Sequence, residues 1–246
     1  MIVRRILFHW HGYRVFSYPT MLYIGTVLGI FAGNRAAHAA GLDAFRVWIA
    51  TLTLFAAALI GARLLFVAIE WQRHGRYPHR LFDRNQGGAA QYGGLLLALP
   101  LSWPLLAALD LPLGAFWDIG VITILVGMTF TRIGCLLNGC CAGREVRRFG
   151  VMLPNVRGEW RRRAPTQILE GALALALLAL GVRAWPALPA PGALFLLLAG
   201  GYAAGRLVLE TLREHPPSTR RFNIQHAISL GIATVSFTTL AMLWKH

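Results

Sequence analysis

Seven apolar blocks, each long enough to cross a bilayer, leave this chain few ways to fold. They cover residues 17–34, 44–70, 89–109, 116–137, 166–183, 192–212 and 224–244. A helix of about 20 residues spans the hydrocarbon core of a membrane. Only 14% of the residues are charged, whereas soluble domains carry about 25%. The sequence predicts an all-α polytopic membrane protein with seven transmembrane helices around a central lipid-binding cavity. We expect these helices to form a single integral-membrane domain over residues 1–246.

Two blocks have alternative interpretations. The third contains Gly93-Gly94, Pro100 and Pro104, so a kinked or partly re-entrant segment is plausible where it lines a cavity. The first block follows two basic residues, Arg4 and Arg5, and this order is also typical of a signal peptide. Because the apolar run over 17–34 is longer than a usual signal-peptide core, we expect it to be a retained first helix.

The basic residues are placed unevenly between the blocks. The N-terminus and the loops after the second, fourth and sixth blocks carry 17 of the 24 Lys and Arg residues. In a soluble protein a net charge of +14 would indicate nucleic acid, but beside membrane helices it favours anionic lipid headgroups. The positive-inside rule, taken alone, puts this side in the cytoplasm.

The stretch from Thr131 to Arg144, at the end of the fourth block, contains two arginines, an asparagine, three glycines and all three cysteines. Ionisable residues at membrane depth mark functional sites by default. The cysteines allow three interpretations: small residues packed between helices, thiols activated by Arg132 and Arg144, or ligands. Their spacing is not that of a zinc site and no histidine is near, so we expect no metal.

Charged residues also lie within other blocks. Arg63, Arg132 and Arg206 fall on the second, fourth and sixth predicted helices, and Glu210 follows Arg206 by four residues, so these two can pair. Other acidic residues are Glu70, Asp118 and Glu170. One interpretation is an internal salt-bridge network that fixes helix packing. The other is a cationic pocket for a phosphate-bearing lipid headgroup, which the excess of arginines favours.

Two polar segments flank these helices. Residues 87–94 are glycine-rich and contain Tyr92, which could transfer a proton or simply lie at the membrane interface. Pro165 suits the first turn of a helix, and Gln167 and Glu170 share one face of that helix. The arginine-rich loop over 144–164 is a candidate lid or headgroup-facing arm.

These motifs together resemble the prolipoprotein diacylglyceryl transferase family. Residues 132–144 read Arg-Ile-Gly-x-x-x-Asn-Gly-x-x-x-Gly-Arg, which is similar to the family signature. Further matches are Gly61-Ala62-Arg63, Gln91-Tyr92-Gly93-Gly94, Pro165-Thr166-Gln167 with Glu170, Gly205-Arg206 with Glu210 and Arg213, and Gln225 with Ser229. Cys135, Cys140 and Tyr92 mark a variant of the commonest family form.

The resemblance implies a transferase that moves diacylglyceryl from phosphatidylglycerol to the lipobox cysteine of a prolipoprotein and releases glycerol phosphate. It implies a bacterial inner-membrane location with the active-site side facing the periplasm, against the charge rule, and no cofactor or metal. The expected partners are phosphatidylglycerol, the prolipoprotein signal peptide and membrane lipids. Nucleic acid is not expected.

The resemblance also assigns roles to residues. The implied catalytic residues are Arg132, Arg206, Tyr92 and Glu210. The implied substrate-binding residues are Arg63, Gln91, Gly93, Gly94, Asn138, Gly139, Gly143, Gln167, Glu170 and Arg213. Two alternatives remain open: a non-catalytic phospholipid-binding membrane paralogue, and a membrane thiol-redox protein that uses Cys140 and Cys141.

Overall fold

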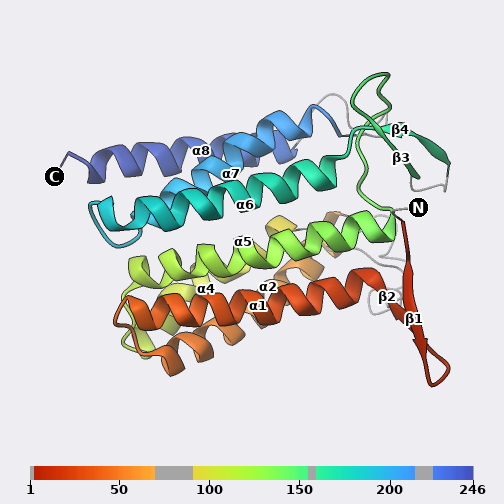
Figure 1. The fold of residues 1–246 in the computed structure, drawn as a ribbon. Helices are drawn as coiled ribbons and strands as arrows, with labels where there is room; N and C mark the ends of the chain where they lie inside the picture. Colours follow the sequence, from red (N-terminus) through yellow and green to blue (C-terminus); the bar gives the residue numbers. More distant parts are fainter. Residues whose placement is uncertain (1–2, 70–90, 155–158, 214–223, 246) are drawn as a thin grey trace. The chain divides into compact units, whose positions relative to one another are not determined.

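The computed structural model describes residues 3–69, 91–154, 159–213 and 224–245, and these residues are mainly helical. The helices are α1 (Ser17–Ala39), α2 (Ala44–Ile69), α4 (Gln91–Ala108), α5 (Leu113–Asn138), α6 (Thr166–Ala184), α7 (Ala193–Glu210) and α8 (Ile224–Leu243), with a short 3₁₀ turn, η2 (Trp185–Ala187) (Figure 1). Each predicted apolar block coincides with one helix, which confirms the helical prediction. Glu70 and residues 87–90 lie outside the described residues.

Five of the described helices are long and apolar enough to cross a membrane. They are residues 44–68, 113–138, 166–187, 193–210 and 226–243, and the apolar part of α4 is shorter. Large apolar side chains point outward from them, such as Val182 and Val208, which are 66% and 67% exposed. A soluble protein would bury such side chains in helices this apolar. The chain is therefore a multi-pass membrane protein.

The described chain divides into two compact units. The first comprises residues 1–36 and 117–246, and the second comprises residues 37–116. In the second unit α2 and α4 meet at paired glycines: a Cβ added at Gly61 would clash with the Gly93 carbonyl oxygen, and the reverse holds for Gly93. Small residues let membrane helices approach this closely. Helix α4 continues through Pro100 and Pro104.

Glycines also set the packing of α1 in the first unit. Gly25, Gly29 and Gly33 recur every four residues along α1, and an added Cβ at each would lie within 3 Å of an atom on α5. The α1 backbone therefore packs directly against α5. Further along α5 an apolar cluster joins it to α6 and α7: Val121, Ile122, Leu125, Ala174, Leu177, Leu194 and Leu198.

Two short hairpins, which the apolar pattern did not predict, flank this helical unit. Strands β1 (Ile6–Trp10) and β2 (Tyr13–Phe16) pair before α1, and β3 (Val151–Pro154) pairs with β4 (Trp160–Arg163) between α5 and α6. His11 and Gly12 in the first turn have φ angles of 47° and 82°, as type I′ hairpin turns require. The second hairpin forms most of the predicted arm.

Asp118 on α5 caps the start of α7. Its carboxylate, in a residue only 3% exposed, accepts hydrogen bonds from the backbone N–H of Gly192 at 2.7 Å and of Phe195 at 2.8 Å. Asp118→Ala is expected to lower the free energy of unfolding by about 1–2 kcal/mol, because two buried donors lose their acceptor. Asp118→Asn should lower the free energy of unfolding by less, because the amide oxygen can still accept a hydrogen bond. Thermal unfolding in detergent measures both, and an alanine variant as stable as the wild type would refute the cap.

Candidate active site

Glu170 is the centre of a buried charge cluster in the first unit. Its side chain, 1% exposed, lies one turn inside α6 and pairs with three arginines. Arg132 Nη2 is 2.5 Å from Oε2 and Arg213 Nη1 is 3.1 Å from Oε1, while Arg206 Nη1 also binds Oε1. These arginines come from α5, α7 and the segment after α7. The carboxylate therefore ties three parts of the chain together.

Arg206 and Glu210 form the pair that their spacing predicted. Arg206 Nη2 lies 3.1 Å from Glu210 Oε2, and both side chains are more than nine-tenths buried. Among the described residues, the cluster contains three guanidinium groups and two carboxylates, so the positive charges outnumber the negative ones by one. The ion pairs of Arg132 and Arg206 are those of the internal salt-bridge network considered above, while the cationic pocket for a lipid headgroup stays a prediction.

Arg132 keeps a donor that the carboxylates do not use. Its side chain is 11% exposed, and its buried Nε has no hydrogen-bond partner among the described residues. A buried N–H without a partner is costly, and guanidinium groups match phosphate oxygens in geometry. This nitrogen is therefore a buried donor that the described part of the chain leaves without an acceptor.

Tyr202 was missed by the sequence reasoning. It precedes Arg206 by four residues on α7 and lies within electrostatic reach of Arg132, Glu170 and Arg206. The helical spacing from Arg206 could have revealed it, because residues four apart share a face. Its phenol adds a hydroxyl to the cluster.

The signature stretch ends α5 in a Schellman motif. The N–H of Cys140 bonds to the Cys135 carbonyl at 3.1 Å, and that of Gly139 bonds to the Leu136 carbonyl at 3.1 Å. Gly139 has a φ of 70°, the left-handed conformation that this motif requires. Asn138 is the last helical residue, and its carbonyl accepts a bond from Arg5 at 3.2 Å. The Asn-Gly pair therefore stops the helix and turns the chain.

The loop after this turn is fastened to the start of α6. Gln167 Nε2 donates to the Cys140 carbonyl at 2.7 Å, and Thr166 Oγ1 donates to the Cys141 carbonyl at 2.7 Å. Gln167 was predicted to bind substrate, and the structure gives it this positioning role one turn before Glu170. Figure 1 shows the end of α5, the start of α6 and the end of α7 at the same end of this unit.

Gly143 packs its backbone against two other segments. Its N–H bonds to the Ala164 carbonyl at 2.9 Å, and it forms a backbone bridge with Arg213. An added Cβ would lie 2.5 Å from the Leu212 carbonyl oxygen. Close approach of three backbones therefore requires glycine here.

Gly143→Ala is expected to displace the segment that carries Arg213 and to lower both stability and any activity of the cluster. A clash with backbone cannot be relieved by a rotamer change, and overpacking costs about 1–3 kcal/mol. Gly231→Ala on α8 is the matched control, because nothing lies within 4 Å of its added Cβ. Thermal unfolding should separate the two variants; equal melting temperatures would contradict the close approach.

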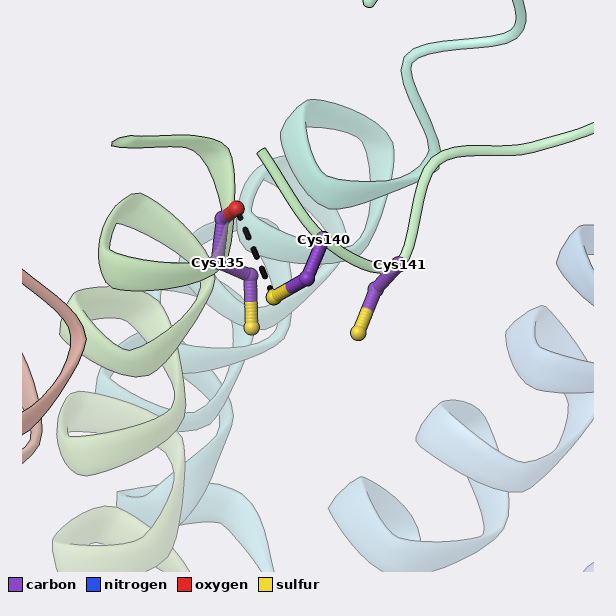
Figure 2. A group of neighbouring side chains, drawn as sticks. All are labelled: Cys135, Cys140 and Cys141. Carbon is purple, nitrogen blue, oxygen red and sulfur yellow. Dashed lines mark hydrogen bonds between the residues drawn. The ribbon is translucent and has the colours of Figure 1, made fainter. Parts of the chain in front are cut away.

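The three cysteines are free thiols gathered at this turn. Figure 2 shows their sulfur atoms on the same side of the loop, with the Cys140 thiol donating to the Cys135 carbonyl at 3.7 Å. The pKa of Cys141 is lowered, because its sulfur accepts hydrogen bonds from the thiols of Cys135 and Cys140. The positive charges of Arg213 and Arg132, which lie near, lower the pKa further.

Another buried arginine, Arg163, lies within the arm predicted over residues 144–164. Arg163 on β4 is 1% exposed, and its guanidinium contacts the Gly143 carbonyl at 3.4 Å and Glu145 Oε1 at 3.3 Å. This residue was not singled out among the seven arginines of the loop, because sequence alone does not separate a buried arginine from exposed neighbours. It connects the arm to the loop that holds Gly143.

The remaining predicted residues are not part of this cluster as described. Arg63, Gly93 and Gly94 belong to the second unit, where the Arg63 guanidinium carbon lies 5.5 Å from the Phe66 ring centroid. The backbones of Gln91 and Tyr92 begin α4, but their side chains and that of Gln225 lie outside the described part. The roles expected for these residues stay predictions.

Comparisons with known proteins match almost the whole chain. The family model for prolipoprotein diacylglyceryl transferase covers residues 5–244. Relatives named phosphatidylglycerol–prolipoprotein diacylglyceryl transferase include one from Bacillus cytotoxicus, 28% identical over 94% of this chain and 89% of the relative. Another, from Enterococcus faecalis, is 28% identical over 86% of this chain and 80% of the relative. The chain therefore belongs to the prolipoprotein diacylglyceryl transferase family.

Proposed function

We propose that this protein transfers diacylglyceryl from phosphatidylglycerol to the cysteine thiol of a prolipoprotein signal peptide and releases glycerol phosphate. Family membership supports the reaction. The observation that carries the site is the buried cluster around Glu170, in which three arginines outnumber two carboxylates. One phosphodiester anion would bring this cluster to neutrality.

The products define which bond breaks. The thiol sulfur forms a bond to the terminal glycerol carbon of the diacylglyceryl group, and that carbon's bond to the phosphate oxygen breaks. The bond electrons leave with the oxygen, so the released glycerol phosphate gains a negative charge. The thiol gives up its proton, which balances that charge in solution or on the leaving group. Displacement at carbon therefore needs stabilisation of a phosphate leaving group.

Arg132 and Arg206 are the residues that we assign to this stabilisation. Preorganised donors aimed at developing charge in a dry site commonly contribute more to catalysis than any other single effect. Arg132 offers its unpartnered Nε, and Arg206 is oriented from both sides by Glu170 and Glu210. Arg213, 21% exposed, lies at the more open edge of the cluster, where a headgroup would enter.

The other assignments follow from the family pattern. By that pattern, Tyr92 serves as a proton-transfer or orienting group, and Arg63, Gln91, Gly93 and Gly94 contribute to substrate binding. Gln167 and Gly143 act by holding the signature loop. No cofactor or resident metal is proposed for the transfer, because sulfur attack on carbon requires neither.

The architecture proposed for this activity has seven membrane spans, with α1 and α4 added to the five apolar helices, around a central lipid-binding cavity. The cluster and the basic hairpins would face the periplasm of a bacterial inner membrane. A reporter inserted in the 144–164 arm should be active outside the cytoplasm. Cytoplasmic activity of that reporter would overturn the orientation.

The transfer itself is tested with purified protein in phosphatidylglycerol nanodiscs and a peptide containing a lipobox cysteine. We expect glycerol phosphate in solution and a peptide heavier by one diacylglyceryl group. A peptide with serine in place of that cysteine is the control. A protein that binds phosphatidylglycerol and leaves the peptide unmodified would instead be a non-catalytic paralogue.

A further inference from the structure

We propose that Cys135, Cys140 and Cys141 form a binding site for one copper(I) ion with three thiolate ligands. The three sulfur atoms lie within 4.8 Å of one another. Metal–sulfur bonds of about 2.3 Å place three sulfurs around one ion roughly 4 Å apart. Small side-chain rotations would therefore complete the site.

Helix geometry explains how residues with this spacing come together. The Schellman motif that ends α5 joins the Cys140 N–H to the Cys135 carbonyl, so the side chains at these two positions meet. Cys141 then follows with a φ of 62°, which non-glycine residues rarely adopt. That conformation turns its sulfur toward the same side as the others, as Figure 2 shows.

The loop is held in place before any ion binds. Thr166 and Gln167 fix the carbonyls of Cys141 and Cys140 at 2.7 Å each. Cys135 is only 3% exposed, while the other two cysteines are half-buried. A ligand set fixed by its surroundings, closed on one side and reachable on the other, is the arrangement expected of a metal site.

The ligand set indicates which ion fits. Thiolates are soft ligands and select copper(I) and zinc. Zinc in structural sites takes four ligands, and among the described residues no histidine, aspartate or glutamate joins the three cysteines. These three ligands are one short of a structural zinc site, and three thiolates suit a three-coordinate monovalent ion. The resulting charge of −2 faces Arg132 and Arg213, which lie near the Cys141 sulfur.

Binding is a proton exchange without a redox step. Each thiol releases its proton as its sulfur bonds to copper, and copper enters and stays as copper(I). The site is separate from the transfer reaction proposed above, and its test needs no lipid substrate.

The test titrates reduced, detergent-purified protein with copper(I) supplied from a coloured competing chelator under anaerobic conditions. We expect one copper per chain, with ultraviolet sulfur-to-copper charge-transfer absorption. Cys135→Ser, Cys140→Ser and Cys141→Ser should each weaken copper binding at least about tenfold, since even loss of an outer partner of a ligand costs about 10–100-fold. His38→Gln, which changes an exposed histidine that is not a member of the thiol group, should bind copper as the wild type does.

A second measurement does not depend on the folding of the variants. X-ray absorption of the copper-loaded wild type should give three sulfur neighbours at about 2.3 Å. Two sulfur neighbours, no copper retained by reduced protein, or equal binding by the Cys135/Cys140/Cys141→Ser triple variant would overturn the proposal. Recovery of the purified chain with a disulfide that resists reduction would overturn it too.

Discussion

Arg206→Ala is expected to reduce glycerol phosphate release about 10²–10³-fold, the effect of removing one donor to a developing oxyanion. Arg206 is 7% exposed and contacts both Glu170 and Glu210, and a water that enters the space left by alanine would supply neither its positive charge nor its fixed donors. Because the charge grows only as the carbon–oxygen bond breaks, the loss should appear mainly in kcat, with a smaller change in KM. Arg206→Lys should recover part of the rate, since lysine keeps the charge without the planar fork.

Arg183→Ala is the control for this substitution. Arg183 is an exposed arginine in the last turn of α6, at the end away from Glu170, and its loss should leave the release of glycerol phosphate unchanged. Thermal unfolding of both variants separates lost chemistry from lost fold. A folded Arg206→Ala variant with wild-type kcat would remove Arg206 from the mechanism.

Glu170→Ala should have the largest effect on stability of any single change in the cluster. Arg132, Arg206 and Arg213 would then lose their shared carboxylate in a buried place. Breaking a buried ion pair from one side costs about 3–5 kcal/mol, because the remaining charges are left uncompensated. Glu170→Gln keeps the volume of the side chain but not its charge, so we expect the free energy of unfolding to fall by nearly as much.

Asp110→Asn provides the comparison in the second unit. Asp110 is 83% exposed and pairs with Arg46 at 3.2 Å, and exposed pairs contribute about 0–1 kcal/mol. Denaturant unfolding in detergent should show a small decrease in the free energy of unfolding for Asp110→Asn and a large decrease for both Glu170 variants. A Glu170→Gln variant that unfolds like the wild type would show that the carboxylate does not hold the arginines together.

The helices could be predicted because each one is encoded by a continuous apolar segment of the sequence. Each span is a run of apolar residues without a strong competing pattern, so predicted and observed ends differ by only a few residues except at the end of α1, which continues to Ala39. The hairpins were missed because their strands are only four or five residues long, and because β4 (Trp160–Arg163) is mostly arginine. Strands this short contain too few residues to show a period.

The candidate site was predictable in its members and less so in its arrangement. The i, i+4 spacing predicted the Arg206–Glu210 pair directly. The central position of Glu170 depends on three segments meeting, which no spacing along the chain reveals. Likewise, the sulfurs of Cys135 and Cys140 meet because a helix ends between them, and their linear spacing has no zinc pattern.

The first ligand of the proposed copper site, Cys135, follows Arg132 by three residues on α5, and the other two cysteines come just after the end of that helix. Both sites therefore share the turn at Asn138 and Gly139, and both depend on the start of α6 through Gln167 and Glu170. No cysteine is paired to Glu170 or Glu210 among the described residues, but the negative charge of the copper–thiolate group would act on Arg132 and Arg213, which lie near the Cys141 sulfur.

The fate of the bridging oxygen tests the central claim most directly. Phosphatidylglycerol is labelled with ¹⁸O between phosphorus and the diacylglyceryl carbon, and the protein is supplied with a lipobox peptide. If the arginine cluster stabilises a phosphate leaving group, the released glycerol phosphate carries the label and equals the thioether peptide in amount. Label found in diacylglycerol, with the peptide unmodified, would show cleavage at phosphorus and contradict the account.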